Sequence, residues 1–125
     1  MRILFILFIL FNTALGFSQE AVFSINESVY KFPKTIEGVV LEHTFVFTNT
    51  GTVPLFINDF AVACTCTKVI YSKDPILPGK SGTVKIIFDT NGKYEYQDRE
   101  ILLSVNTKKK TVKLRFKVFV IPKED

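Results

Sequence analysis

Alternation of side chains at a period of two recurs along this chain and limits its fold more than any other feature. One run sets apolar or aromatic side chains against more polar ones: Leu41, His43, Phe45 and Phe47 against Glu42, Thr44, Val46 and Thr48. Successive side chains of a β-strand point to opposite faces, so this run predicts a strand with one buried face. Beyond residue 18, apolar residues do not recur at intervals of three and four, and no helix is predicted.

Several other segments have the same strand character. The longer ones are residues 55–57 extending towards 62, 84–88, 101–105 and 112–120, and the shorter ones are 21–25, 30–32 and 68–71. Turn residues such as Asn49-Thr50-Gly51, Pro78-Gly79 and Asn91-Gly92 separate them. Seven or eight short strands in about 100 residues predict an all-β, immunoglobulin-like antiparallel sandwich. The antibody-type signature is absent, because there is no tryptophan and the two cysteines are too close to join opposite sheets.

The first residues have the pattern of a signal peptide. Arg2 gives a positive start, residues 3–11 are all apolar, and small residues follow at Ala14, Gly16 and Ser18. The apolar run is shorter than the roughly 20 residues of a membrane-spanning helix. We therefore expect cleavage of residues 1–18 and export of a single domain, residues 19–125, to the periplasm or beyond, with no membrane span in the mature form.

Charge is unevenly distributed in the mature chain. Without Arg2 there are 15 basic and 12 acidic residues, a net charge of +3, and 13 of the basic residues follow residue 67. Six form a candidate face for an anionic partner: Lys108, Lys109, Lys110, Lys113, Arg115 and Lys117. The alternative is a solvated last strand whose charges protect a sheet edge from pairing. Nucleic acid is not an expected partner, because aromatic side chains do not interleave with these charges and the protein is exported.

The only two cysteines, Cys64 and Cys66, lie in the segment VACTCTK. In a straight strand their α-carbons would be about 6.6 Å apart, so a disulfide between them requires a bend. Export favours that disulfide. Two alternatives stay open: a soft-metal pair for an ion such as Cu(I), and thiol exchange, for which Lys68 is the only nearby positive charge. Zinc would need His43 and a carboxylate, or a second molecule. We assign no metal and no cofactor.

Catalytic constellations are not evident. A nucleophilic triad needs a histidine beside the nucleophile, and the only histidine, His43, lies in the middle of a predicted strand. Glu95, Asp98 and Glu100 fall in a polar stretch that we interpret as a loop with solvated charges, not as a pair of carboxylates facing across a cleft. The sequence therefore predicts that the protein is not an enzyme.

Three motifs resemble those of an exported bacterial family, the domain of unknown function 1573 family. They are FVFTNTGTVPLFI at 45–57, CTCT at 64–67 and PILPGKSGTVKIIFDT at 75–90. The resemblance implies an immunoglobulin-like sandwich akin to the ASPM, SPD-2 and Hydin domains, which act as binding or scaffolding modules. Thr65 stands where the family usually has glycine, and Phe32-Pro33 replaces the usual Phe-Gly, which suggests an edge or a bend there.

Taken together, these features predict a non-enzymatic binding or scaffolding module of the cell envelope, with another envelope protein as its partner. The alternative is a periplasmic thiol protein that uses Cys64 and Cys66 for soft-metal binding or disulfide exchange.

Overall fold

The computed structural model describes residues 19–124, which form two facing β-sheets and contain no helix. The predicted signal peptide, residues 1–18, lies outside the described residues. The strands are β1 (Phe23–Ser24), β2 (Val29–Lys31), β3 (Thr35–Ile36), β4 (Val40–Asn49), β5 (Ile57–Val62), β6 (Thr67–Tyr71), β7 (Ser81–Asp89), β8 (Glu95–Val105) and β9 (Thr111–Ile121).

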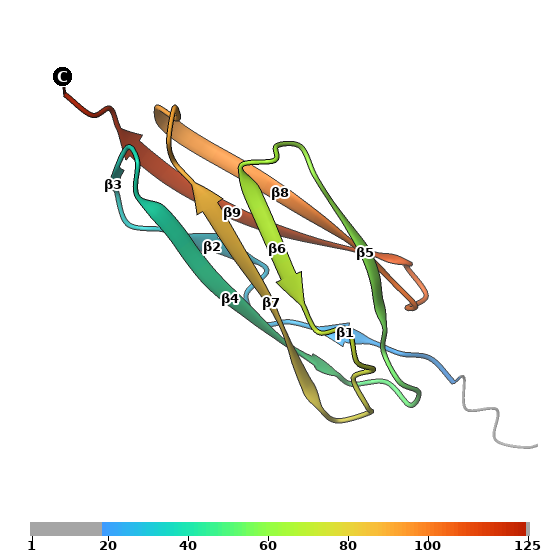
Figure 1. The fold of residues 1–125 in the computed structure, drawn as a ribbon. Coiled ribbons are helices and arrows are strands. Elements are labelled where there is room, and N and C mark those ends of the chain that lie inside the picture. Colours follow the sequence, from blue (N-terminus) through green and yellow to red (C-terminus); the bar gives the residue numbers. More distant parts are fainter. Residues whose placement is uncertain (1–18, 125) are drawn as a thin grey trace, which may run out of the picture.

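Figure 1 shows the two layers. The first sheet has the order β1-β4-β7-β6, and the second has the order β2-β9-β8-β5, with β3 also paired to β9. The predicted sandwich is confirmed. Two details of the prediction are wrong. Residues 19–124 form nine strands, one more than the largest predicted number, since the two-residue β3 was not predicted. The second sheet is mixed, because β2 and β3 run parallel to β9.

Alternation explains the core. On β4, Phe45 and Phe47 point inward and are almost fully buried, and Phe88 and Phe116 meet them from β7 and β9. The rings of Phe88 and Phe116 have centroids 5.0 Å apart in a tilted arrangement. Aliphatic side chains of β7, β8 and β9 fill the remaining interior. Burial of these apolar side chains is the main force that holds the two sheets together.

One buried polar side chain, Asn49, joins β4 to the segments around it. Its Oδ1 accepts hydrogen bonds from the backbone N–H of Val22 and Gly51, at 3.2 and 2.9 Å. Its Nδ2 donates to the carbonyls of Val53 and Ile76, at 2.8 and 2.9 Å. The Asn-Thr-Gly motif is therefore more than a turn, because its first side chain bonds four backbone groups, of which only the Ile76 carbonyl has another backbone partner, Leu55 N–H.

Two predictions about the charged segments are wrong. Glu95, Asp98 and Glu100 do not lie in a loop, because β8 begins at Glu95. The charges of β9 do not guard a sheet edge, because β8 pairs with one side of β9 while β2 and β3 pair with the other. Phe32-Pro33 lies in the break between β2 and β3, which both pair with β9 at the edge of the second sheet, so the edge suggested by this pair is present.

Candidate functional site

The two cysteines lie in the turn between β5 and β6, where the structure joins them in a disulfide. Their α-carbons are 5.2 Å apart, closer than in a straight strand and within the usual range for a disulfide. Two backbone bonds hold the turn: Thr67 N–H donates to Cys64 O at 3.2 Å, and Asp89 N–H donates to Cys66 O at 3.0 Å. In this state neither sulfur atom is a thiolate that could bind a soft metal ion.

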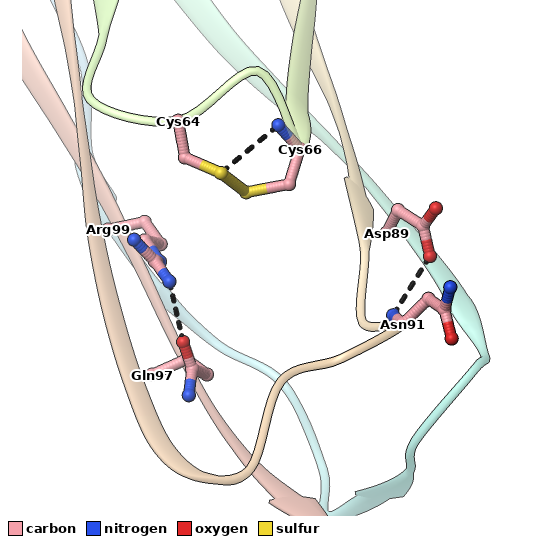
Figure 2. The surroundings of a disulfide bond; sticks show 6 residues. All are labelled: Cys64, Cys66, Asp89, Asn91, Gln97 and Arg99. Carbon is pink, nitrogen blue, oxygen red and sulfur yellow. Dashed lines mark hydrogen bonds between the residues drawn. A yellow bond between two sulfur atoms is a disulfide. The ribbon is translucent and has the colours of Figure 1, made fainter.

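A third contact lies within the turn itself. The backbone N–H of Cys66 donates to Cys64 Sγ at 3.2 Å (Figure 2). Both cysteines are half-buried, but they face different surroundings. Cys66 packs against the hydrophobic core, whereas Cys64 lines an open hollow of about 350 Å³.

Arg99 lies on the same hollow and comes from β8, far away in the sequence. It occupies an inward-facing position, in step with the buried Ile101 and Leu103. Its Nη2 donates to Gln97 Oε1 at 2.7 Å, and its guanidinium lies 5.7 Å from the centre of the Phe88 ring. Figure 2 shows Arg99 and Gln97 joined by this hydrogen bond in the surroundings of the disulfide.

The charge of Arg99 has no carboxylate partner. Within residues 19–124 it forms no ion pair, and its Nε is buried without a hydrogen-bond partner. From the sequence, Lys68 was the only positive charge expected near the cysteines, and Arg99 was not predicted to lie there. The alternation of β8 could have indicated Arg99. Every second residue counted back from Leu103 faces inward, and this series reaches Ile101 and then the charged side chain of Arg99.

The other charges around the hollow are already paired. Arg115 contacts both Asp98 and Glu100, with Nε 3.3 Å from Asp98 Oδ1, and Lys113 Nζ lies 3.7 Å from Glu100 Oε1. The strand register places Lys117 directly opposite Asp98. The six predicted basic residues therefore divide into two groups, with Lys108, Lys109 and Lys110 in the exposed β8–β9 turn and the rest on a strand face where carboxylates interleave.

His43 lies on β4, away from any cluster of potential ligands. Its ring stacks on Tyr30 with centroids 3.6 Å apart, and it meets the edge of Phe45 at 4.7 Å. The part of the chain that the structure describes has no group of three or more His, Cys, Asp and Glu side chains placed to hold a metal ion. Burial lowers the pKa of His43 below 6.5, and the negative charge of Glu27 partly opposes this shift.

The lowered pKa of His43 predicts a loss of stability in acid. Below about pH 6.5 the unfolded chain binds a proton at this histidine more readily than the folded protein does, so the free energy of unfolding should fall as the pH drops. Denaturant unfolding at about pH 7.5 and pH 5 should show a larger loss for the wild type than for His43→Gln. Equal losses would contradict the assignment, because the carboxylates that also titrate in this range are common to both proteins.

One side of β4 has backbone groups without partners. Asn49 N–H donates to Lys80 O, so the odd-numbered residues of β4 bond β7, while Thr50 N–H donates to Val22 O on the opposite side. The backbone N–H and C=O groups of the even-numbered residues thus point away from β7. On that side β4 pairs only with the short strand β1, at Thr48 and Asn49 (Figure 1). The remaining N–H and C=O groups, which we call the open edge, belong to Val40, Glu42, Thr44 and Val46.

The open edge is long and accessible. Its four residues span about 20 Å, and all are exposed. No strand among residues 19–124 pairs with it. It carries no proline and no lysine, two residues with which proteins commonly protect sheet edges, and its one charged side chain, Glu42, lies 3.2 Å from Lys85 of β7.

Comparisons with known proteins agree with this architecture. A model of the family described as "Protein of unknown function (DUF1573)" matches residues 23–120. The curated proteins contain no match to the chain. The described residues contain no helix long and apolar enough to cross a membrane.

Several solved structures share the fold. A protein of unknown function from Porphyromonas gingivalis W83 has 15% identity and a TM-score of 0.71, covering 87% of this chain and 50% of that one. PapD-like domain 7 of human CEP192 has 12% identity and a TM-score of 0.67, covering 89% and 94%. The Vibrio cholerae VesB protease has 13% identity and a TM-score of 0.60, covering 82% and 32%.

These identities establish the fold alone. This chain spans half of the Porphyromonas protein and about a third of the protease, but nearly all of the CEP192 domain. The predicted immunoglobulin-like fold is confirmed, and the CEP192 domain that shares this fold is a PapD-like domain.

Proposed function

The chain belongs to the DUF1573 family, and we propose that it is a non-enzymatic binding module of the cell envelope that captures an extended segment of a partner protein along its open edge. The observation that carries this proposal is the row of exposed, unpaired backbone groups from Val40 to Val46. Strand addition uses such groups directly, since the backbone bonds supply affinity and alternate side chains supply specificity. The envelope location rests on the predicted signal peptide.

The side chains of the edge suit a partner of mixed character. Val40 and Val46 are apolar and more than half exposed, at 54% and 58%, and Thr44 and Glu42 lie between them. An added strand would place its own side chains opposite these, and cross-strand pairs of β-branched residues are favourable. We expect the captured segment to carry β-branched residues opposite the two valines.

Thr44→Pro tests the edge most directly. Proline removes the N–H at the centre of the open edge, and it leaves the bonds to β7 intact because they belong to the odd-numbered residues. Thr44→Val is the matched control, since it keeps the N–H and the β-branched shape. In the full chain expressed in its host, a photo-crosslinking residue at position 46 should form a discrete adduct, identified by mass spectrometry.

We expect the adduct to decrease roughly tenfold in Thr44→Pro and to persist in Thr44→Val, because about 1.4 kcal/mol of binding free energy corresponds to one lost backbone bond. Thermal unfolding of both variants checks that the fold is retained. An adduct that survives proline would overturn strand capture. Replacing Cys64 and Cys66 with serine should leave the adduct unchanged, whereas its loss would favour the thiol-based alternative.

A further inference from the structure

We propose that the β5–β6 turn is a thiol–disulfide exchange site, in which Cys64 is the attacking thiolate and Arg99 is the positive charge that holds it. The substrate class is an extracytoplasmic disulfide, of a protein or of a small thiol compound. This goes beyond strand capture, because the turn and the residues that line the hollow come from β5, β6, β8 and β9 and include no residue of the open edge.

The first argument is the hydrogen bond to sulfur. Cys66 N–H lies 3.2 Å from Cys64 Sγ and points at it. A donor stabilises a thiolate more than a neutral thiol, because the bond becomes charge-assisted. Two backbone bonds, from Thr67 N–H to Cys64 O and from Asp89 N–H to Cys66 O, hold this turn in addition to the disulfide. We therefore expect the donor to stay near Cys64 when the pair is reduced.

The second argument is the uncompensated charge of Arg99. This guanidinium lines the same hollow as Cys64, is anchored by the neutral Gln97 and the Phe88 ring, and has no ion-pair partner among residues 19–124. A positive charge beside a cysteine favours the reactive thiolate. Asp98 and Glu100 also line the hollow and would oppose this effect, but Arg115 and Lys113 pair with them.

The two cysteines differ in a way that assigns their roles. Cys64 lines the open hollow, where a substrate disulfide can approach, whereas Cys66 packs against the core. Lys68, which follows Cys66 and Thr67 in the sequence, is exposed, so solvent screens its charge. The asymmetry makes Cys64 the nucleophile and Cys66 the resolving thiol.

The reaction follows from these positions. The reaction starts from the dithiol form, which a small extracytoplasmic thiol compound produces by reducing the Cys64–Cys66 bond and becoming a disulfide itself. The Cys64 thiolate attacks one sulfur of the substrate disulfide, a mixed disulfide forms at Cys64, and the first substrate thiolate leaves with the electron pair. The Cys66 thiolate then attacks Cys64 Sγ, the Cys64–Cys66 bond forms, and the second substrate thiolate leaves. The protein loses two electrons, the substrate gains two, and the two protons of the cysteine thiols end on the two products.

Single-cysteine variants test the assignment. Cys66→Ser leaves Cys64 alone, and Cys64→Ser leaves Cys66 alone. At about pH 7 we expect iodoacetamide to alkylate Cys64 at least tenfold faster than Cys66, since an ordinary cysteine is only a few per cent thiolate there. A pH profile up to about pH 10, where both are thiolates, separates thiolate fraction from access. If the alkylation rates of Cys64 and Cys66 at pH 7 are equal once each is divided by its rate at about pH 10, the proposal is overturned.

Arg99 variants test the charge. In the Cys66→Ser background, Arg99→Gln should slow alkylation of Cys64 at pH 7 at least threefold, while Arg99→Lys and the control Lys68→Gln should not. The two-cysteine protein in a glutathione buffer should shift towards the disulfide in Arg99→Gln by a similar factor. No effect of Arg99→Gln on a protein that unfolds like the wild type would refute the role of Arg99. If Arg99→Gln does not fold, the single-cysteine comparison still decides the proposal.

The two proposals fail separately. Thr44→Pro should leave the alkylation rate of Cys64 unchanged, because the open edge contributes nothing to the hollow. A slow Cys64 with an intact crosslink at position 46 would overturn exchange and leave strand capture standing.

Discussion

Phe116→Ala is expected to reduce the free energy of unfolding by about 3–5 kcal/mol, a large part of the stability of a domain of this size. Phe116 is fully buried on β9 and contacts Phe88 and Phe32, with ring centroids at 5.0 and 5.9 Å. The second contact ties the segment after β2 to the core. The substitution therefore opens a cavity between the two sheets and also weakens the packing of the segment after β2, which contains Phe32.

Phe119→Ala is the matched control for this prediction. Phe119 is the same residue type on the same strand, but its side chain points outward, is 38% exposed and has the ammonium group of Lys34 5.6 Å from its ring. Its removal should cost about 1 kcal/mol or less. Urea unfolding of both variants measures the difference, provided the slope with denaturant is unchanged. Similar losses would contradict the placement of the core.

Asn49→Ala is expected to be nearly as damaging, at about 3 kcal/mol or more. The alanine would leave the N–H groups of Val22 and Gly51 and the carbonyl of Val53 without partners, in surroundings where Asn49 has no exposed surface. It would also remove one of the two hydrogen bonds to the Ile76 carbonyl, which still accepts from Leu55 N–H. Each buried polar group that loses its partner costs about 1–3 kcal/mol, less where water can enter.

Asn106→Ala provides the comparison for Asn49. Asn106 makes the same kind of bridge, accepting from Phe56 N–H at 2.7 Å and donating to Pro54 O at 2.9 Å, but it is exposed. Water can replace those bonds, so we expect a loss of about 1 kcal/mol. Thermal or urea unfolding measures both variants. A loss at Asn106 as large as that at Asn49 would show that burial does not set the cost.

Asn49 also shows how much of the role of the Asn-Thr-Gly motif could be predicted from the sequence. Its place before Thr50-Gly51 predicted a turn, and the chain does leave β4 there. The four bonds of its side chain involve residues up to 27 positions away. Gly51 and Val53 are local partners, but no local pattern encodes Val22 and Ile76, because these become neighbours of Asn49 only when β1 and the Ile76 segment fold onto the same end of the sandwich.

The disulfide site, too, could be predicted only in part from the sequence. The spacing of Cys64 and Cys66 already showed that a bond between them needs a bend, and the structure provides that bend as the β5–β6 turn. Arg99 could not be assigned to the site from spacing, since it comes from β8, which is far from the cysteines in the sequence and becomes their neighbour only when β8 pairs with β5. The sequence shows that a charged residue occupies an inward-facing position of β8, but it does not show that Cys64 lines the same hollow.

The sequence by itself determined the strand-forming segments, the faces that they bury and the two-layered architecture, because alternation at a period of two is a local property of the backbone. The order of the strands was decided only in the tertiary structure. That order made β9 an interior strand, left one side of β4 open and brought Arg99 beside Cys64. The physical reason is that backbone pairing depends on which strands meet, and every strand carries the same N–H and C=O groups whatever its side chains are.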